Sequence, residues 1–181
     1  MISIKDVKEA DLFKGLNVRQ LQRLSKDFIE TSFQAGEVIF SQGEPAQKLY
    51  ILMEGEVTLG IKAKGQIDIT AYSVNKKGEV FGLPSLIKPY QNNVTATCNK
   101  KTKVLCIQGG TLRKLMKNDS KMGIEIMDKI AETYLNRLNS TRAMITNLFK
   151  MFKFQTGKTK SWRHIMRHSP IKARRGAGRG G

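Results

Sequence analysis

Short β-prone segments separated by glycine-bearing turns occupy the middle of the chain, and this pattern limits the fold more than any other feature. The segments lie at 37–40, 48–53, 56–61, 67–74, 80–81, 94–98 and 103–107. Turn signals at such regular intervals are typical of an all-β sandwich or barrel. We therefore expect residues 31–109 to form a β domain.

Amphipathic helices are expected on both sides of this β region. Residues 18–30 place Leu21, Leu24 and Phe28 at helical spacing, within an N-terminal helical segment over 1–30. C-terminal helices are expected over 110–149, the second of them capped by Asp119 or Ser120. If its apolar stripe continues without a break, that helix reaches about thirty residues, which is long for a globular protein.

Two stretches carry a resemblance to a known family. They read GEVIFSQGEPAQKLYILMEGEV over 36–57 and GEVFGLPSLIKPYQNNVTATC over 78–98. With the order of helix, strands and two helices, they resemble the cyclic nucleotide-binding domain family. The resemblance covers about 10–145 and implies an eight-stranded, jelly-roll-like β-roll with C-terminal helices. It also implies that Phe81 and Gly82 open a phosphate-binding cassette.

The cassette departs from the family at two positions. The resemblance implies a Glu after the glycine and an Arg before the next strand, where this chain has Leu83 and Asn92. A shift of register does not restore the arginine, because no Arg lies between Arg23 and Arg113. The degenerate ligand pocket would consist of Phe81, Gly82, Leu83, Pro84, Ser85, Asn92, Asn93, Val94 and Thr95.

Two interpretations of this pocket stay open. In the first, ligand binding is lost and Leu83 fills the sugar position, so that the protein has no cofactor. In the second, a cyclic nucleotide binds weakly at the helix N-terminus near Pro84 and Ser85, with Lys88 or Asn92 replacing the arginine.

The C-terminal part of the chain is strongly basic. The formal net charge is +17, and the last acidic residue is Glu132. The 49 residues after Glu132 contain 12 Lys or Arg. A segment of one sign favours an acidic partner. We expect a basic extension over 150–181, unfolded when free.

This extension combines cations with apolar side chains. Its candidate partner-binding residues are Lys150, Lys153, Lys158, Lys160, Trp162, Arg163, Arg167, Lys172, Arg174, Arg175 and Arg179. An acidic protein surface in a larger complex is the preferred partner, for example a tubulin-like filament. RNA is a second candidate, and an anionic membrane or a calmodulin-type groove is less favoured. Packing of Leu148 and Phe152 onto the β-roll is the structural alternative.

Enzyme and metal chemistry find little support in the sequence. No GxSxG, Walker-type or HExxH motif occurs. His164 and His168 lie four residues apart without a third metal ligand nearby, and Cys98 and Cys106 fit buried free thiols. No helix-turn-helix pattern follows the long helix, so a DNA-binding regulator ranks third.

We therefore expect a non-catalytic interaction subunit in the cytoplasm, with a cytoskeletal or ciliary location as the narrower expectation. A cyclic-nucleotide-responsive regulatory module and an RNA-associated assembly protein are the alternatives.

Overall fold

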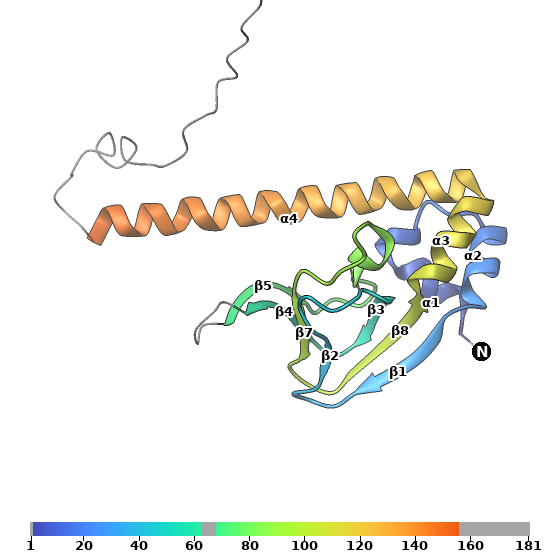
Figure 1. Cartoon of the computed structure of the whole chain (residues 1–181), viewed down its shortest axis with the longest axis horizontal. Coiled ribbons are helices and arrows are strands. Elements are labelled where there is room, and N and C mark those ends of the chain that lie inside the picture. Colours follow the sequence, from blue (N-terminus) through green and yellow to red (C-terminus); the bar gives the residue numbers. More distant parts are fainter. Residues whose placement is uncertain (1, 63–67, 156–181) are drawn as a thin grey trace, which may run out of the picture. The chain divides into compact units, whose positions relative to one another are not determined.

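The β-prone segments form two four-stranded antiparallel sheets in the computed structural model, which describes residues 2–62 and 68–155. The order is β1-β8-β3-β6 in one sheet and β2-β7-β4-β5 in the other. The strands are β1 (Ile29–Phe33), β2 (Val38–Phe40), β3 (Lys48–Glu54), β4 (Val57–Lys62), β5 (Asp68–Val74), β6 (Val80–Phe81), β7 (Thr95–Cys98) and β8 (Thr102–Gln108). The expected eight-stranded β-roll is thus confirmed (Figure 1).

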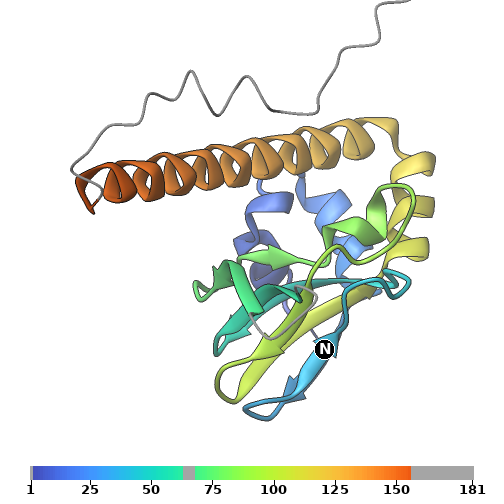
Figure 2. The ribbon, with the colours of Figure 1, turned by 60° about the vertical axis from the view of Figure 1, so that its left-hand side comes forward.

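Helices precede and follow the roll, and one short helix lies between β6 and β7. They are α1 (Ile4–Glu9), the 3₁₀ helix η1 (Asp11–Phe13), α2 (Val18–Ser25), the 3₁₀ helix η2 (Leu83–Leu86), α3 (Gly109–Asn118) and α4 (Ser120–Gln155). Helices α1, α2 and α3 gather at one end of the roll (Figures 1 and 2). The chain divides into two compact units, Met1–Leu138 and Asn139–Gly181, and the boundary falls inside α4.

The first amphipathic helix is shorter than expected. It starts at a capping box made by Asn17 and Gln20 and ends at Ser25, five residues before the expected end at Glu30. Ile29 instead begins β1, which pairs with β8 from Ile29 opposite Cys106 to Phe33 opposite Thr102. Apolar residues at helical spacing suggested a longer helix, but strand pairing decides the conformation here because β-branched and aromatic residues alternate along β1.

Strand β3 separates two apolar clusters. Leu49 and Ile51 belong to an outer cluster shared with the N-terminal helices, α3 and the start of α4. Tyr50 and Leu52 belong to an interior cluster between the sheets. Successive side chains of a strand point to opposite faces, so one short strand supports both clusters.

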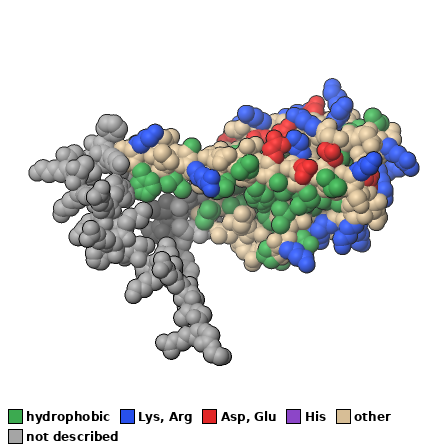
Figure 3. Space-filling model, turned by 90° about the horizontal axis from the view of Figure 1, so that it is seen from above, with side chains coloured by type: hydrophobic (Ala, Val, Ile, Leu, Met, Phe, Trp, Pro, Cys, Tyr) green, Lys and Arg blue, Asp and Glu red, His purple; other side chains and the backbone are tan. Residues whose placement is uncertain are grey.

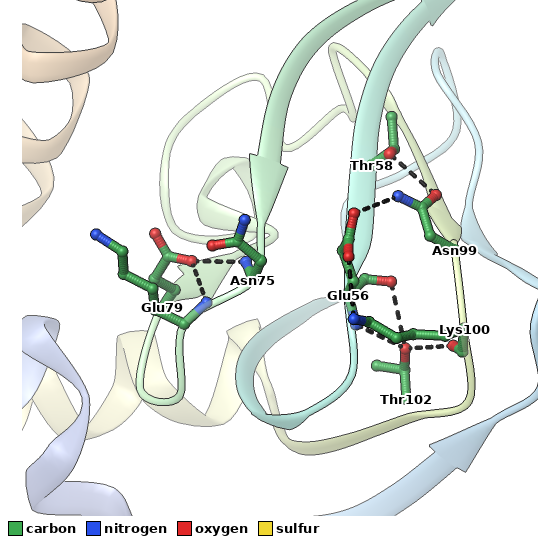
Figure 4. Close-up of polar contacts among 8 residues, drawn as sticks. Glu56, Thr58, Asn75, Glu79, Asn99, Lys100 and Thr102 are labelled. Atoms are coloured by element: carbon green, nitrogen blue, oxygen red, sulfur yellow. Dashed lines mark hydrogen bonds and ion pairs between the residues drawn. The ribbon is translucent and has the colours of Figure 1, made fainter.

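Polar contacts hold the turns at the strand ends (Figure 4). The Glu79 carboxylate accepts hydrogen bonds of 2.8 Å from the backbone N–H groups of Asn75 and Lys76. At the start of β4, Glu56 accepts a bond of 2.9 Å from the Asn99 side chain and forms an ion pair with Lys100. These contacts fix the turns that lead into β6 and β8.

Asp119 provides the expected cap of the long helix. Its carboxylate accepts hydrogen bonds from the Met122 backbone N–H at 3.0 Å and the Gln20 side chain at 3.1 Å. The backbone bond from Met122 is the main reason why the pKa of Asp119 is lowered. From this cap α4 continues for 36 residues, somewhat beyond the expected length.

Candidate functional site

The cassette begins where β6 ends. Phe81 closes β6 inside the roll, and Gly82 follows in the left-handed region with φ of 76°. A Cβ built on Gly82 would lie 2.5 Å from the Lys48 carbonyl oxygen. A glycine is therefore required for the chain to turn from β6 into η2.

Three aromatic rings form the floor of the roll beside the cassette. Tyr50 and Phe81 stack with ring centroids 5.0 Å apart, and Phe40 lies 5.9 Å from Tyr50 and 6.2 Å from Phe81. Burial raises the pKa of Tyr50 to about 12, so its hydroxyl stays neutral at physiological pH. The Phe40 ring is tilted by 31° and 33° to the other two, and Phe81 is fully buried, so the three rings form an uncharged, apolar cluster of which Phe40 and Tyr50 line the adjacent hollow.

Leu83 does not occupy the interior of the roll. Its side chain is 1% exposed and packs in the outer cluster. The expectation that Leu83 fills the sugar position is therefore wrong, because the turn at Gly82 directs the next side chain toward the helices. The interior contains the aromatic floor instead.

The cassette contacts α3, which lies beside it in both views (Figures 1 and 2). Arg113 donates a hydrogen bond to the Ser85 carbonyl and stacks over the Tyr90 ring at 4.2 Å from its centroid. Ser85 itself is fully buried, and a Cβ built on Gly109 of α3 would come within 2.9 Å of the Ser85 Cβ. The Ser85 side chain thus packs toward α3, after Pro84 in the first turn of η2.

The second half of the expected pocket lies before and along β7. Asn92 is 5% exposed, and its backbone pairs with the loop after β2 through Gly43 and Glu44. Asn93 is exposed, whereas Val94 packs against the interior cluster. Thr95 is buried and accepts a 3.0 Å hydrogen bond from the Gln42 backbone N–H.

A hollow of about 400 Å³ opens between these elements. It is lined by Ile39, Phe40, Glu44, Pro45, Gln47, Lys48, Tyr50 and Asn92. Asn92, at which the resemblance implies an arginine, is thus one of the lining residues. Lys88 is exposed and is not part of this lining.

Sequence reasoning missed Lys48 and Glu44, which bring opposite charges to the hollow. The signal for Lys48 was present, because it precedes Tyr50 by two positions in β3 and strand alternation places both on one face. No comparable period existed for Glu44, which lies in a loop.

Cys98 and Cys106 are buried free thiols, as expected, and burial raises the pKa of Cys98. Over residues 2–62 and 68–155, no cluster of His, Cys, Asp or Glu could hold a metal ion. Within the same ranges, no helix is both long enough and apolar enough to cross a bilayer.

The candidate partner-binding residues are only partly described. Lys150 is exposed on α4, and Lys153 lies in the last turns of that helix. Lys158, Lys160, Trp162, Arg163, Arg167, Lys172, Arg174, Arg175 and Arg179 lie outside the described residues, as do both histidines.

Known proteins share this arrangement. The sequence model of the cyclic nucleotide-binding domain matches residues 30–119. The curated protein named CRP-like cAMP-activated global transcriptional regulator, from Mycobacterium tuberculosis, is 23% identical over 134 residues. That match covers 74% of this chain and 59% of the regulator, so the chain spans about three fifths of the regulator's length.

Solved structures agree with this match. The regulatory subunit of a cAMP-independent protein kinase A from Trypanosoma brucei has a TM-score of 0.65 and 15% identity. The match covers 78% of this chain and 50% of that subunit, and at this identity it shows the fold alone. A protein from Geobacter metallireducens GS-15, named as cyclic nucleotide-binding, has a TM-score of 0.68 and 34% identity, over 76% of this chain and 99% of its own. The chain therefore belongs to the cyclic nucleotide-binding domain family.

Proposed function

We propose that this chain is a non-catalytic interaction module whose pocket no longer holds a cyclic nucleotide in the manner that the resemblance implies. The observation that carries the proposal is Asn92, which is buried and lines the hollow, and which stands in the sequence where the resemblance implies an arginine. Since no Arg lies between Arg23 and Arg113, no other residue of the roll can supply a guanidinium there.

The missing charge is large enough to decide affinity. A hydrogen bond to a charged group contributes about 1.5–3 kcal/mol, which corresponds to roughly 10- to 150-fold in affinity. Lys48 offers a cation at the hollow, but Glu44 offsets it from the same lining. The Trypanosoma brucei relative, described as cAMP-independent, is a precedent for this fold without response to cAMP.

The basic C-terminal extension is proposed to anchor the module to an acidic protein surface in a larger cytoplasmic complex. Support comes from the charge, since 12 Lys or Arg and no acid follow Glu132. A tubulin-like filament, in the cytoskeleton or a cilium, is a partner of this chemistry. RNA offers similar charge, but recognition of RNA uses stacking as well as phosphate contacts.

One alternative function has a specific observation in its favour. The hollow of about 400 Å³ has an aromatic floor and a lysine in its lining, so it has room for a small ligand. The Mycobacterium tuberculosis relative is named as cAMP-activated. A cyclic-nucleotide-responsive regulatory module is therefore the second candidate.

Calorimetry with cyclic AMP and cyclic GMP separates these two functions. We expect no heat of binding and no thermal stabilisation at millimolar ligand. A stabilisation above about 2 kcal/mol, which requires ligand at roughly thirtyfold its dissociation constant, would establish the regulatory module and reject the degenerate pocket.

Co-sedimentation with microtubules over a salt series tests the anchor. Several Lys and Arg on a polyanionic surface should make binding fall steeply with salt. Replacing Arg174, Arg175 and Arg179 with Gln in the full chain should weaken binding and flatten the salt dependence. Binding to single-stranded RNA but not to microtubules would favour the RNA-associated role instead.

A further inference from the structure

The part of α4 that belongs to the second unit has an exposed apolar face. Met144, Ile145, Leu148, Phe149 and Met151 are 50%, 46%, 48%, 51% and 64% exposed. At 100° per residue, these side chains cover an arc of about 160° on one side of the helix. These five side chains form the apolar face of this stretch.

Basic side chains occupy the other side of the same stretch. With 100° per residue, Arg142 lies about 110° and Lys150 about 170° from the centre of the apolar face. Figure 3 shows hydrophobic and basic side chains together at the surface of this part of the chain. No Asp or Glu follows Glu132, so the stretch is cationic throughout.

These charges limit what can cover the apolar face. Large apolar side chains exposed together on one face usually mark an interaction site. A second copy of the same stretch would bring only further cations to it, and like charges that face each other repel. A partner surface that complements this part of α4 is therefore apolar in the middle and acidic at its edges.

The angles also distinguish a groove from a flat surface. A helix that lies on an anionic membrane needs cations near the boundary of its apolar face, where they reach the headgroups. Arg142 lies near that boundary, but Lys150 lies about 100° beyond it, so acidic groups that meet Lys150 must reach around the helix. The walls of a deep groove do so, whereas a flat lipid surface does not.

We propose that residues 139–151 bind, as a helix, in an apolar groove of a partner protein whose rim carries Asp and Glu side chains. This inference rests on the proposed interaction function and deepens it. The basic extension supplies electrostatic attraction, and the apolar helix contact would select the partner.

The test uses the full chain with calcium-loaded calmodulin as the probe, because its methionine-rich grooves accept basic amphipathic helices. Calorimetry should show calcium-dependent binding of the unmodified chain. The pair Ile145→Asn with Leu148→Asn should weaken that binding at least about thirtyfold, because two central apolar anchors are lost.

The matched control is Ala143→Asn with Thr146→Asn. Both positions lie on the polar side of the same helical turns, so the control receives the same two residues without losing an apolar contact. It should bind within about threefold of the unmodified chain. Circular dichroism of all three proteins checks that helix content is equal.

The contrary outcomes are distinct. The inference is overturned if calmodulin does not bind, or if both double variants bind equally well. Two further results also reject it. One is binding of the chain to phosphatidylserine vesicles but not to calmodulin, and the other is self-association in sedimentation that Leu148→Asn abolishes. If microtubule binding stays salt-dependent, and the double substitution of Ile145 and Leu148 changes neither microtubule binding nor calmodulin binding, the proposed function survives and this inference fails.

Discussion

Replacing Asn92 by Arg tests whether the pocket still has the shape of a nucleotide site. Asn92 is 5% exposed and lines the hollow, with its backbone fixed by hydrogen bonds of 2.7 and 2.9 Å to the loop after β2. The new guanidinium would therefore start from a held backbone and extend into a space of about 400 Å³. Little of the surrounding core needs to move.

The size of the expected gain follows from the charge. A guanidinium that meets a phosphate adds about 1.5–3 kcal/mol, or roughly 10- to 150-fold in affinity. Lys48 lies in the same lining and repels the new charge, whereas Glu44 attracts it and competes with the phosphate. Both effects reduce the gain, so we expect its lower half, about 10- to 40-fold.

Calorimetry with cyclic AMP and cyclic GMP measures the gain. The matched control is Asn93→Arg, which adds the same charge at the exposed neighbouring residue. Asn92→Arg should produce saturable binding, and Asn93→Arg should produce none. Equal weak binding by both variants would indicate a general attraction of anions, and a folded Asn92→Arg protein that binds nothing would refute the idea that the pocket keeps its shape.

Three further substitutions test the cassette and the helix cap, each by urea unfolding. Gly82→Ala should cost at least about 2 kcal/mol because its Cβ meets the Lys48 carbonyl, whereas Gly36→Ala, also at positive φ but in open space, should cost about 1 kcal/mol. Leu83→Glu should cost at least about 3 kcal/mol, because it places a carboxylate in an apolar cluster. Asp119→Ala should remove a pH-dependent part of the stability. The folded-state pKa of Asp119 is lowered, so its contribution is present above about pH 4, is lost as the pH falls through the folded value, and should be absent from the variant.

Much of the β-roll could be predicted from local patterns. The segments expected at 48–53 and 103–107 correspond to β3 and β8 within one residue at each end. Glycine turns and alternation mark such strands directly. Strand β1 was missed because Leu21, Leu24 and Phe28 keep a helical spacing up to its first residue, and its pairing with β8 is a contact between distant parts of the sequence.

The direction of Leu83 could not be predicted in the same way. Strand alternation ends at Phe81, and the 3₁₀ helix that follows has no period linked to the sheet. The left-handed conformation of Gly82 determines which cluster the next side chain joins. The sequence shows that Leu83 stands where the family has a glutamate. It does not show that the Leu83 side chain packs on the other side of the sheet.

This placement explains how the cassette keeps its shape without the phosphate contact. Leu83 and Leu86 pack in the outer cluster, and Arg113 binds the Ser85 carbonyl and stacks on Tyr90. None of these contacts involves a ligand, so the proposed loss of the phosphate contact at position 92 would leave this structure in place. The two departures from the family therefore differ in their surroundings. Asn92 lies at an open hollow and can be changed to Arg, whereas Leu83 is part of the core, so that restoring the glutamate there would destabilise the fold before it could restore a ligand contact.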